Sequence, residues 1–291
     1  MTFIEELVDL VRTADESAGP AVVTIGTRGR GTGFVIAPGK VLTNAHNLRD
    51  QTTQVRFADG RTVQAAVAGS DVDGDLVVLD VDTADIAPLA WADEPPGPGD
   101  VVVTLTAGRH GRRATWGQVT GTSVGFPGPR GRPIRGALEH TAPCAPGSSG
   151  APVLDTAGRV VGINTHRLEY GFYLARTVDA ALRQVVDGML QGRTFEPAHL
   201  GVALAAPNVA ARLRSAVGLP ERDGLLVREV ADGSPAAGAG IKSGDLLVRA
   251  GDTDLRSPED LFGVLATVAD GDHLDLSLVR GAEELTVTVA F

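Results

Sequence analysis

The chain is built of short apolar segments separated by turn residues, and this pattern predicts a mainly β protein. Between residues 21 and 92, runs rich in Val, Ile, Leu and Thr alternate with Gly, Asp and Asn. Six segments show the pattern: 21–25, 31–38, 40–46, 53–69, 75–81 and 87–92. The segment 53–69 is predicted to be a hairpin with its turn at 58–60. Six short segments with few helices predict a small barrel, because a closed barrel leaves no sheet edge unpaired.

A second series of six strand segments follows the Pro- and Gly-rich stretch 93–100, which is a candidate linker. These segments lie at 100–108, 115–125, 137–142, 150–155, 159–166 and 170–177. Apolar residues at helical spacing then predict a helix over 178–190. We therefore expect one domain over 21–192, made of two similar barrels, 21–97 and 98–178, and the helix that follows them.

The composition changes after this helix, and residues 199–291 predict a separate domain. Strands are expected at 199–205, 223–230, 244–252, 273–280 and 284–291. Between them, Ser257 is a candidate cap for a helix whose first position is Pro258, because a serine side chain can accept from the free amides of the first turn.

The first 20 residues predict an amphipathic helix, with apolar side chains at positions 3, 4, 7, 8, 10 and 11. This segment has acidic residues near its start and lacks both the basic start and the small-residue cleavage site of a secretory signal. On that basis we predict a cytoplasmic protein. The apolar face must dock on something, either its own domain or another subunit.

Composition excludes several classes of function. The net charge of −10 disfavours nucleic acid and anionic lipid as partners. No run approaches the roughly 18 apolar residues of a membrane span. The single cysteine, Cys144, excludes an intrachain disulfide, and the six histidines show no metal-ligand spacing. Two arginine-rich stretches, 108–116 and 128–136, are best interpreted as solvated loops, with a specific anionic partner as the alternative.

The candidate chemistry lies in three segments far apart in the sequence. The stretch PGSSGAP at 146–152 is by composition a turn, unless a base and an acid elsewhere activate one of its serines. His46 ends a predicted strand, and Asp75 directly precedes the apolar run 76–79. Each alone is an ordinary turn residue. Together with Ser149, they follow one of the known chain orders of the Ser-His-Asp triad, and they would meet in the cleft between the two barrels.

The segments VLTNAHN, GDLVVLDV and APGSSGAPVLDTAGRVVGINT resemble the catalytic segments of the HtrA/Deg family of trypsin-like serine proteases. HLGV, GSPAAGAGIKSGDLLVRAGD and SPEDL resemble the PDZ domain that follows in that family. The resemblance covers essentially the whole chain after residue 20. It implies a trypsin-like double six-stranded β-barrel followed by one PDZ domain, and no metal or organic cofactor.

Carried over residue by residue, the resemblance makes His46 the general base, Asp75 its orienting acid and Ser149 the nucleophile. The backbone N–H groups of Gly147 and Ser149 would form the oxyanion hole. The chain departs from the family pattern at three positions that remove no catalytic group: Asn47, Ser148 and Ala151. The first hairpin, TIGTRGRGTGF, lacks the long loop of some relatives, which disfavours a cage-forming, chaperone-like assembly.

The residues before the nucleophile, TAPCAPG, should wall the pocket for the substrate side chain. They include no carboxylate, so we expect a small or medium apolar side chain there rather than Lys or Arg. Cys144 is expected to be a buried wall residue, with a reactive thiol as the alternative.

In the C-terminal domain, the resemblance assigns peptide binding to a short segment, His199, Leu200, Gly201 and Val202. Its amides would capture a peptide's terminal carboxylate, and the peptide would add as a strand beside 201–205, against the helix near Pro258. The alternative is that Leu200 and Val202 are plain core residues.

The sequence thus predicts an endopeptidase of protein quality control that cleaves unfolded or misfolded polypeptides and is tuned by its PDZ domain. The alternatives are a catalytically silent scaffold and a dedicated processing protease with one partner. Relatives often form trimers through N-terminal segments, so the helix at 3–11 is a candidate contact for a homotrimer, and the sequence leaves the oligomeric state open.

Overall fold

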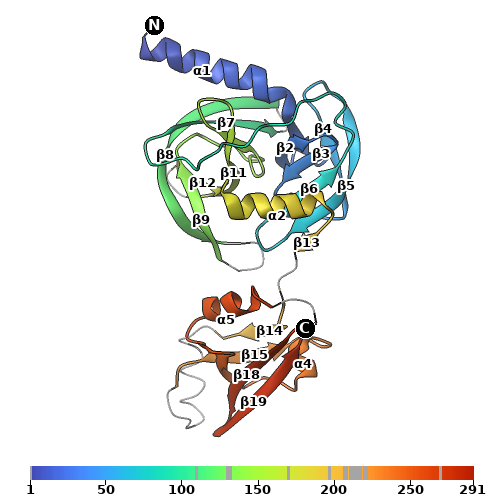
Figure 1. The fold of residues 1–291 in the computed structure, drawn as a ribbon, viewed down its shortest axis with the longest axis vertical. Coiled ribbons are helices and arrows are strands. Elements are labelled where there is room, and N and C mark those ends of the chain that lie inside the picture. The colour runs from blue at the N-terminus through green and yellow to red at the C-terminus, as the bar shows by residue number, and fades with distance from the viewer. Residues whose placement is uncertain are drawn as a thin grey trace. The chain divides into compact units, whose positions relative to one another are not determined.

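A computed structural model describes residues 2–108, 111–128, 133–168, 171–195, 198–205, 209, 218, 222–268 and 271–291. The chain divides into two compact units, Met1–Glu196 and Pro197–Phe291 (Figure 1). The described elements are mainly strands, so the predicted fold class is confirmed.

The first barrel closes on itself through six antiparallel strands. These are β1 (Val22–Ile25), β2 (Gly31–Ala37), β3 (Lys40–Thr43), β4 (Thr52–Arg56), β5 (Thr62–Asp71) and β6 (Leu76–Asp80). Their order is β5-β4-β1-β2-β3-β6, and an additional pairing of β5 with β6 closes the ring. The interior is filled by apolar side chains such as Phe34 and Leu79, which are completely buried.

One predicted strand of this barrel was wrong. Residues 87–92 form no strand but a connection with a single bridge, between Trp91 and Val160. Pro88 within this segment has no N–H to donate to a ladder. The sixth strand of the barrel instead comes from the hairpin over 53–69, which supplies both β4 and β5.

The second barrel is also closed, in the order β10-β11-β12-β9-β8-β7. Its strands are β7 (Val101–Gly108), β8 (Gly111–Pro127), β9 (Pro133–His140), β10 (Pro152–Leu154), β11 (Val160–Arg167) and β12 (Tyr173–Thr177). The predicted helix follows as α2 (Ala180–Leu190), capped by the Asp179 side chain. Helix α2 packs on β5 of the first barrel, and β13 (Thr194–Phe195) extends the same sheet.

The N-terminal helix α1 (Phe3–Ala18) lies within the first 20 residues, for which a helix was expected. Its second half docks on its own domain, with Ala14 and Ala18 buried in the core and Asp15 in a two-bond ion pair with Arg112 at 2.6 and 3.0 Å. In the first half, Ile4 and Val8 are exposed. Within the described residues, none of the helices has the length and apolar character needed to cross a membrane.

Within its described residues, the second unit is one sheet with two helices beside it (Figure 1). Its elements are β14 (Val202–Leu204), β15 (Leu225–Val230), α4 (Pro235–Gly238), β16 (Leu246–Ala250), β17 (Thr253–Asp254), α5 (Pro258–Leu265), β18 (His273–Arg280) and β19 (Glu283–Ala290). The strand order is β14-β15-β16-β18-β19, with β17 on β16. Helix α5 starts as predicted, with Ser257 at the cap and Asp260 accepting from the Ser257 N–H at 2.7 Å.

The contact between β5 and α2 tolerates no side chain at Gly69. A Cβ atom there would lie 2.5 Å from the Met189 carbonyl oxygen and 2.6 Å from that of Arg193. We expect Gly69→Ala to destabilise the protein by about 2–3 kcal/mol, because overpacking against backbone forces the elements apart. Thermal unfolding followed by circular dichroism measures this. Gly97→Ala is the matched control, since its nearest neighbour would be 3.9 Å away; equal melting temperatures for the two variants would contradict the expectation.

Candidate active site

His46 and Asp75 are brought together at the end of the first barrel. His46 lies on the short 3-10 turn η2 (Ala45–Asn47) after β3, and Asp75 directly precedes β6. Adjacent strands β3 and β6 place these two ends side by side. His46 Nδ1 lies 2.7 Å from Asp75 Oδ2, and the His46 backbone N–H donates to Oδ1 at 3.1 Å. Asp75 therefore holds both the ring and the backbone of His46.

A residue of the second barrel completes the environment of Asp75. Thr165 Oγ1, on β11, donates to Asp75 Oδ2 at 2.8 Å. The Asp75 side chain is almost fully buried, whereas that of His46 is 38% exposed. A buried carboxylate is costly unless it is hydrogen-bonded, and three donors meet this requirement here. The exposed part of the imidazole faces solvent and is open to a substrate.

Asp75 also has an unusual backbone conformation, with φ at 59°. The left-handed region is disfavoured for residues other than glycine. It is stabilised by two donors to the Asp75 carbonyl oxygen, Asn44 Nδ2 at 2.8 Å and the Ala45 N–H at 3.2 Å. The turn before β6 is thereby fixed to the turn that carries His46.

The turn that carries Ser149 is held between the two barrels. From the first barrel, the Thr32 N–H donates to the Ser149 carbonyl oxygen at 2.9 Å, and Thr32 Oγ1 donates to that of Gly147 at 2.8 Å. From the second, the Asn164 carbonyl oxygen accepts from the Gly150 N–H at 2.7 Å. Gly150 has φ at 85°, and a Cβ atom there would lie 2.1 Å from the Thr32 carbonyl oxygen, so only glycine fits.

Asn47, one of the departures from the family pattern, has a structural role. Its side chain is buried and donates to Thr43 Oγ1 at 2.9 Å and to the Ser149 carbonyl oxygen at 2.8 Å. The residue after His46 is therefore tied directly to the turn of Ser149. Sequence reasoning noted Asn47 only as a substitution and missed this contact.

The two backbone amides predicted to form the oxyanion hole are not engaged in hydrogen bonds with the described residues. Neither the Gly147 N–H nor the Ser149 N–H donates a hydrogen bond to another described group. Gly147 has φ at 92°, a conformation that favours glycine. Ser148 instead bonds locally, with its side chain and its N–H both donating to the Ala145 carbonyl oxygen.

A pocket of about 190 Å³ opens beside Ser149. It is lined by residues 144–149, 164–167 and Tyr173, none of which is a carboxylate. Burial raises the pKa of the Cys144 thiol to about 12, so the thiol is protonated at neutral pH and a poor nucleophile. This favours the wall residue over the reactive thiol.

A buried histidine, which the sequence reasoning missed, supports this pocket from behind. His140 is fully buried, its Nε2 lies 2.8 Å from Asn164 Oδ1, and its ring stacks on Tyr173 at 5.8 Å between centroids. Asn164 in turn donates to Thr104 Oγ1 at 2.7 Å. Nδ1 of His140 is buried without a hydrogen-bond partner among the described groups. Burial lowers the pKa of His140, which keeps the ring neutral.

In the second unit, the predicted peptide-binding segment 199–202 leads into the edge strand β14, whose first residue is Val202. Leu200 is buried in the core, and Val202 is half-buried beside it. Gly201 has φ at 80°, and a Cβ atom there would lie 2.2 Å from Ser234 Cβ. The segment 199–202 is thus bent and closely packed. His199 is exposed.

Two other predictions can be placed. Within the described residues, no cluster of His, Cys, Asp and Glu is arranged to hold a metal ion. The arginine-rich stretches 108–116 and 128–136 lie partly outside the described residues, at 109–110 and 129–132.

Known proteins share this architecture. Residues 31–163 match the trypsin-like peptidase domain and residues 199–291 match the PDZ domain. The probable periplasmic serine endoprotease DegP-like of Brucella suis biovar 1 is 30% identical over 283 residues, which cover 90% of this chain and 52% of that protein. The putative serine protease HhoA of Synechocystis sp. is 30% identical over 90% of this chain and 70% of that protein. The solved structure of HtrA-type protease AlgW with decapeptide aligns with a TM-score of 0.72 at 22% identity, over 96% of this chain and 97% of that chain.

These matches confirm the trypsin-like double barrel and the PDZ domain. The chain spans about half the length of the Brucella relative, 52%. The prediction of a cytoplasmic location was wrong, because this relative is named a periplasmic protein. That prediction relied on the composition of the first residues, which form the helix α1 docked on the barrel and carry no information about the compartment.

The neutral state of His140 predicts a pH dependence of stability. An unfolded histidine takes up a proton at about pH 6.5, whereas folded His140 does so only at lower pH. The stabilisation is therefore complete above about pH 6.5 and is lost as the pH falls from there toward the lowered pKa. Each unit by which the pKa is lowered corresponds to about 1.4 kcal/mol, or ~3–6 °C in Tm for a domain of this size.

The measurement is thermal unfolding of the wild type and of His140→Gln between pH 7.5 and 5. The glutamine keeps an N–H donor for Asn164. The wild type should lose more degrees of Tm over this range than the variant. Parallel curves would contradict the assignment.

Proposed function

Because the chain belongs to the HtrA family of trypsin-like serine proteases with one PDZ domain, we propose that it is an endopeptidase with His46, Asp75 and Ser149 as its catalytic triad. The observation that carries this proposal is the 2.7 Å contact between His46 Nδ1 and the buried Asp75 carboxylate. It is supported by the clamped turn of Ser149, which both barrels hold in place.

In the proposed reaction, Ser149 Oγ attacks the carbonyl carbon of the scissile peptide bond, and His46 Nε2 takes the serine proton. The tetrahedral intermediate collapses, the C–N bond breaks, and His46 gives the proton to the leaving amine. Water then hydrolyses the acyl-enzyme by the same two steps. Asp75 keeps the proton of the neutral ring on Nδ1 and stabilises the imidazolium that forms in each step.

The unused amides of Gly147 and Ser149 would bind the oxyanion of the tetrahedral intermediate. Donors that are fixed before the reaction stabilise this charge without reorganisation, and losing one of them costs on the order of 10²–10³ in rate. The positive φ of Gly147 supports this role, because the turn itself sets this backbone conformation and with it the direction of the amide.

The substrate proposal is an extended segment of an unfolded or misfolded polypeptide. A pocket of about 190 Å³ without a carboxylate supports a small or medium apolar side chain before the scissile bond. A folded loop rarely presents such a side chain in extended form, whereas an unfolded chain does. Quality control of damaged proteins is the role that follows, in the periplasm if the location named for the Brucella relative holds for this chain.

For the PDZ domain, we propose binding of peptide C-termini. Strand β14 is the edge of its sheet, so a peptide can add as a further strand there. The bend at Gly201 would direct the amides of Leu200, Gly201 and Val202 at the terminal carboxylate. The AlgW structure was solved with a decapeptide, which supports peptide binding by proteins of this architecture.

We also propose that the protein forms a homotrimer through its N-terminal helix. The exposed side chains of Ile4 and Val8 on α1 support this proposal, because they are free to contact another subunit.

Casein digestion tests the proteolytic activity. The wild type should degrade casein, and Ser149→Ala should lower the rate by a factor on the order of 10³ or more, because the nucleophile is removed. The matched control is Ser148→Ala, which changes the neighbouring serine. Degradation that survives in Ser149→Ala would refute the assignment, and an inactive wild type would favour the silent scaffold.

Fluorescence anisotropy tests carboxylate capture by the PDZ domain. Labelled peptides with an apolar C-terminal residue should bind at least about tenfold more tightly with a free carboxylate than with a C-terminal amide, because the amide cannot accept charge-assisted hydrogen bonds. Equal affinities for the two peptides would contradict capture by the segment 200–202.

A further inference from the structure

Arginine side chains gather beside the proposed active site, on the far side of the turn that precedes Ser149. One concavity is lined by residues 28–30 of the turn between β1 and β2, by Arg113 on β8 and by residues 145–147. Residues 145–147 also line the pocket beside Ser149. This short segment is therefore the wall between the two spaces, with the substrate side-chain pocket on one side and the arginines on the other.

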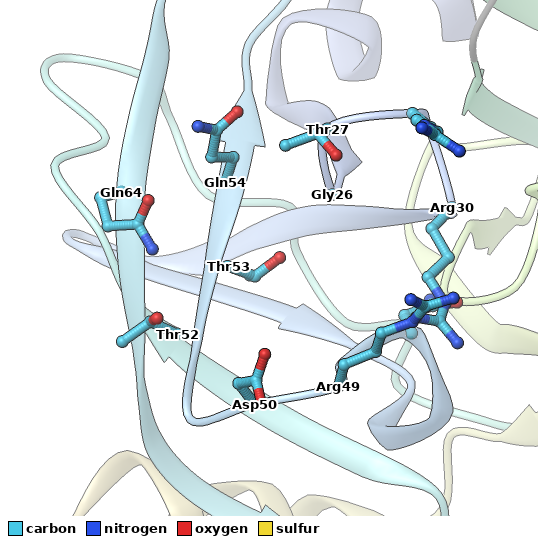
Figure 2. Close-up of a pocket in the computed structure, with 11 residues that line it drawn as sticks. Gly26, Thr27, Arg30, Arg49, Asp50, Thr52, Thr53, Gln54 and Gln64 are labelled. Carbon is cyan, nitrogen blue, oxygen red and sulfur yellow. The ribbon is translucent and has the colours of Figure 1, made fainter.

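A second, larger pocket continues from this concavity over the first barrel. Its lining includes Arg28, Arg30 and Arg49, with threonines and glutamines around them. Figure 2 shows Arg30 and Arg49 reaching from separate loops toward the same side of this pocket. Among the described residues that line these two spaces, Asp50 is the one carboxylate.

These arginines are not neutralised by ion pairs with the described residues. Within the described part of the chain, Arg28, Arg30, Arg49 and Arg113 form no ion pair with an acidic side chain. The chain as a whole has a net charge of −10, so an unpaired basic group around its cleft is opposite in sign to the rest of the molecule. Such a local field attracts anionic groups and is strongest where low-dielectric walls enclose it.

The turn that carries Arg28 and Arg30 is short and held in place. The Arg30 N–H donates to the Ile25 carbonyl oxygen at 2.9 Å, and the Gly26 N–H donates to that of Gln54 at 2.8 Å. The turn also lies against the oxyanion segment, because a Cβ atom on Gly147 would be 3.0 Å from the Gly29 carbonyl oxygen. The backbone that carries these exposed basic side chains is thus fixed next to the segment that precedes Ser149.

We propose that Arg28, Arg30 and Arg49, with Arg113, form a binding site for acidic side chains that follow the scissile bond of the substrate. A substrate whose side chain fills the pocket beside Ser149 must continue past residues 145–147, and this path leads into the basic space. Guanidinium groups bind carboxylates through paired hydrogen bonds, which suits Asp and Glu at the first to third positions after the cut. The inference rests on the proposed protease function and adds a substrate class to it.

The first experiment compares three quenched fluorescent peptides that share all residues before the cut. The positions after the cut carry either two Glu, two Gln or two Lys. At low salt the Glu peptide should be cleaved with a kcat/KM about fivefold to tenfold above the Gln peptide, with the Lys peptide lowest. The ratio of Glu to Gln should fall below about twofold at 1 M NaCl, where the Debye length is only ~3 Å. Equal rates for all three peptides would overturn the inference while leaving the protease function intact.

The second experiment assigns the preference to the arginines. In Arg30→Gln/Arg49→Gln the ratio of Glu to Gln should fall to within about twofold of one. The matched control is Arg12→Gln, a loss of charge at an exposed position of α1 that lines neither pocket. Its ratio should equal that of the wild type. A ratio unchanged in the double variant would also overturn the proposal.

A binding measurement separates this inference from the protease proposal. Ser149→Ala protein should bind a labelled Glu peptide more tightly than the Gln peptide by fluorescence anisotropy, with a difference that salt removes. This holds even if no peptide is cleaved by the wild type, which would refute the protease function alone. Equal affinities would overturn the basic subsite.

Discussion

The buried carboxylate of Asp75 is the constraint on which the rest of the site depends. A charge removed from water must be met by hydrogen-bond donors, and the chain supplies them from both barrels: His46 from the first and Thr165 from the second. The two barrels are thereby locked in the one arrangement that satisfies Asp75. The same arrangement orients the imidazole, so the interaction that stabilises the interface also positions the proposed general base.

A second set of contacts sets the position of the proposed nucleophile. The Ser149 carbonyl oxygen accepts from the Thr32 N–H and from Asn47, both in the first barrel, while its own turn belongs to the second. Gly150 is required because the Thr32 backbone occupies the space of a side chain. Backbone and side-chain contacts between barrels therefore fix the turn that carries Ser149 against the first barrel, which also carries His46. The arginines of the β1–β2 turn lie next to the Ser149 turn because Thr32, their neighbour in sequence, takes part in this clamp.

Much of this was predictable because it has local causes. Alternation of apolar and turn residues predicted the strands of both barrels. The triad of His46, Asp75 and Ser149 was predicted from chain order and stays a proposal. The errors have physical reasons as well. Residues 87–92 have strand composition, but Pro88 interrupts the ladder. The role of His140 was invisible because its partners, Asn164 and Tyr173, come from other strands. The basic pocket was missed for the same reason, since its arginines are ordinary surface residues in sequence and converge only in the fold.

The most direct test of the central claim is labelling with a fluorophosphonate probe, followed by mapping of the modified residue by mass spectrometry. The probe reacts with a serine only when a base and an oxyanion hole activate it. The account predicts one label, on Ser149, and almost none in Asp75→Asn, where the ring would lose its orienting carboxylate. A label on another residue, or no label on the wild type, would contradict it.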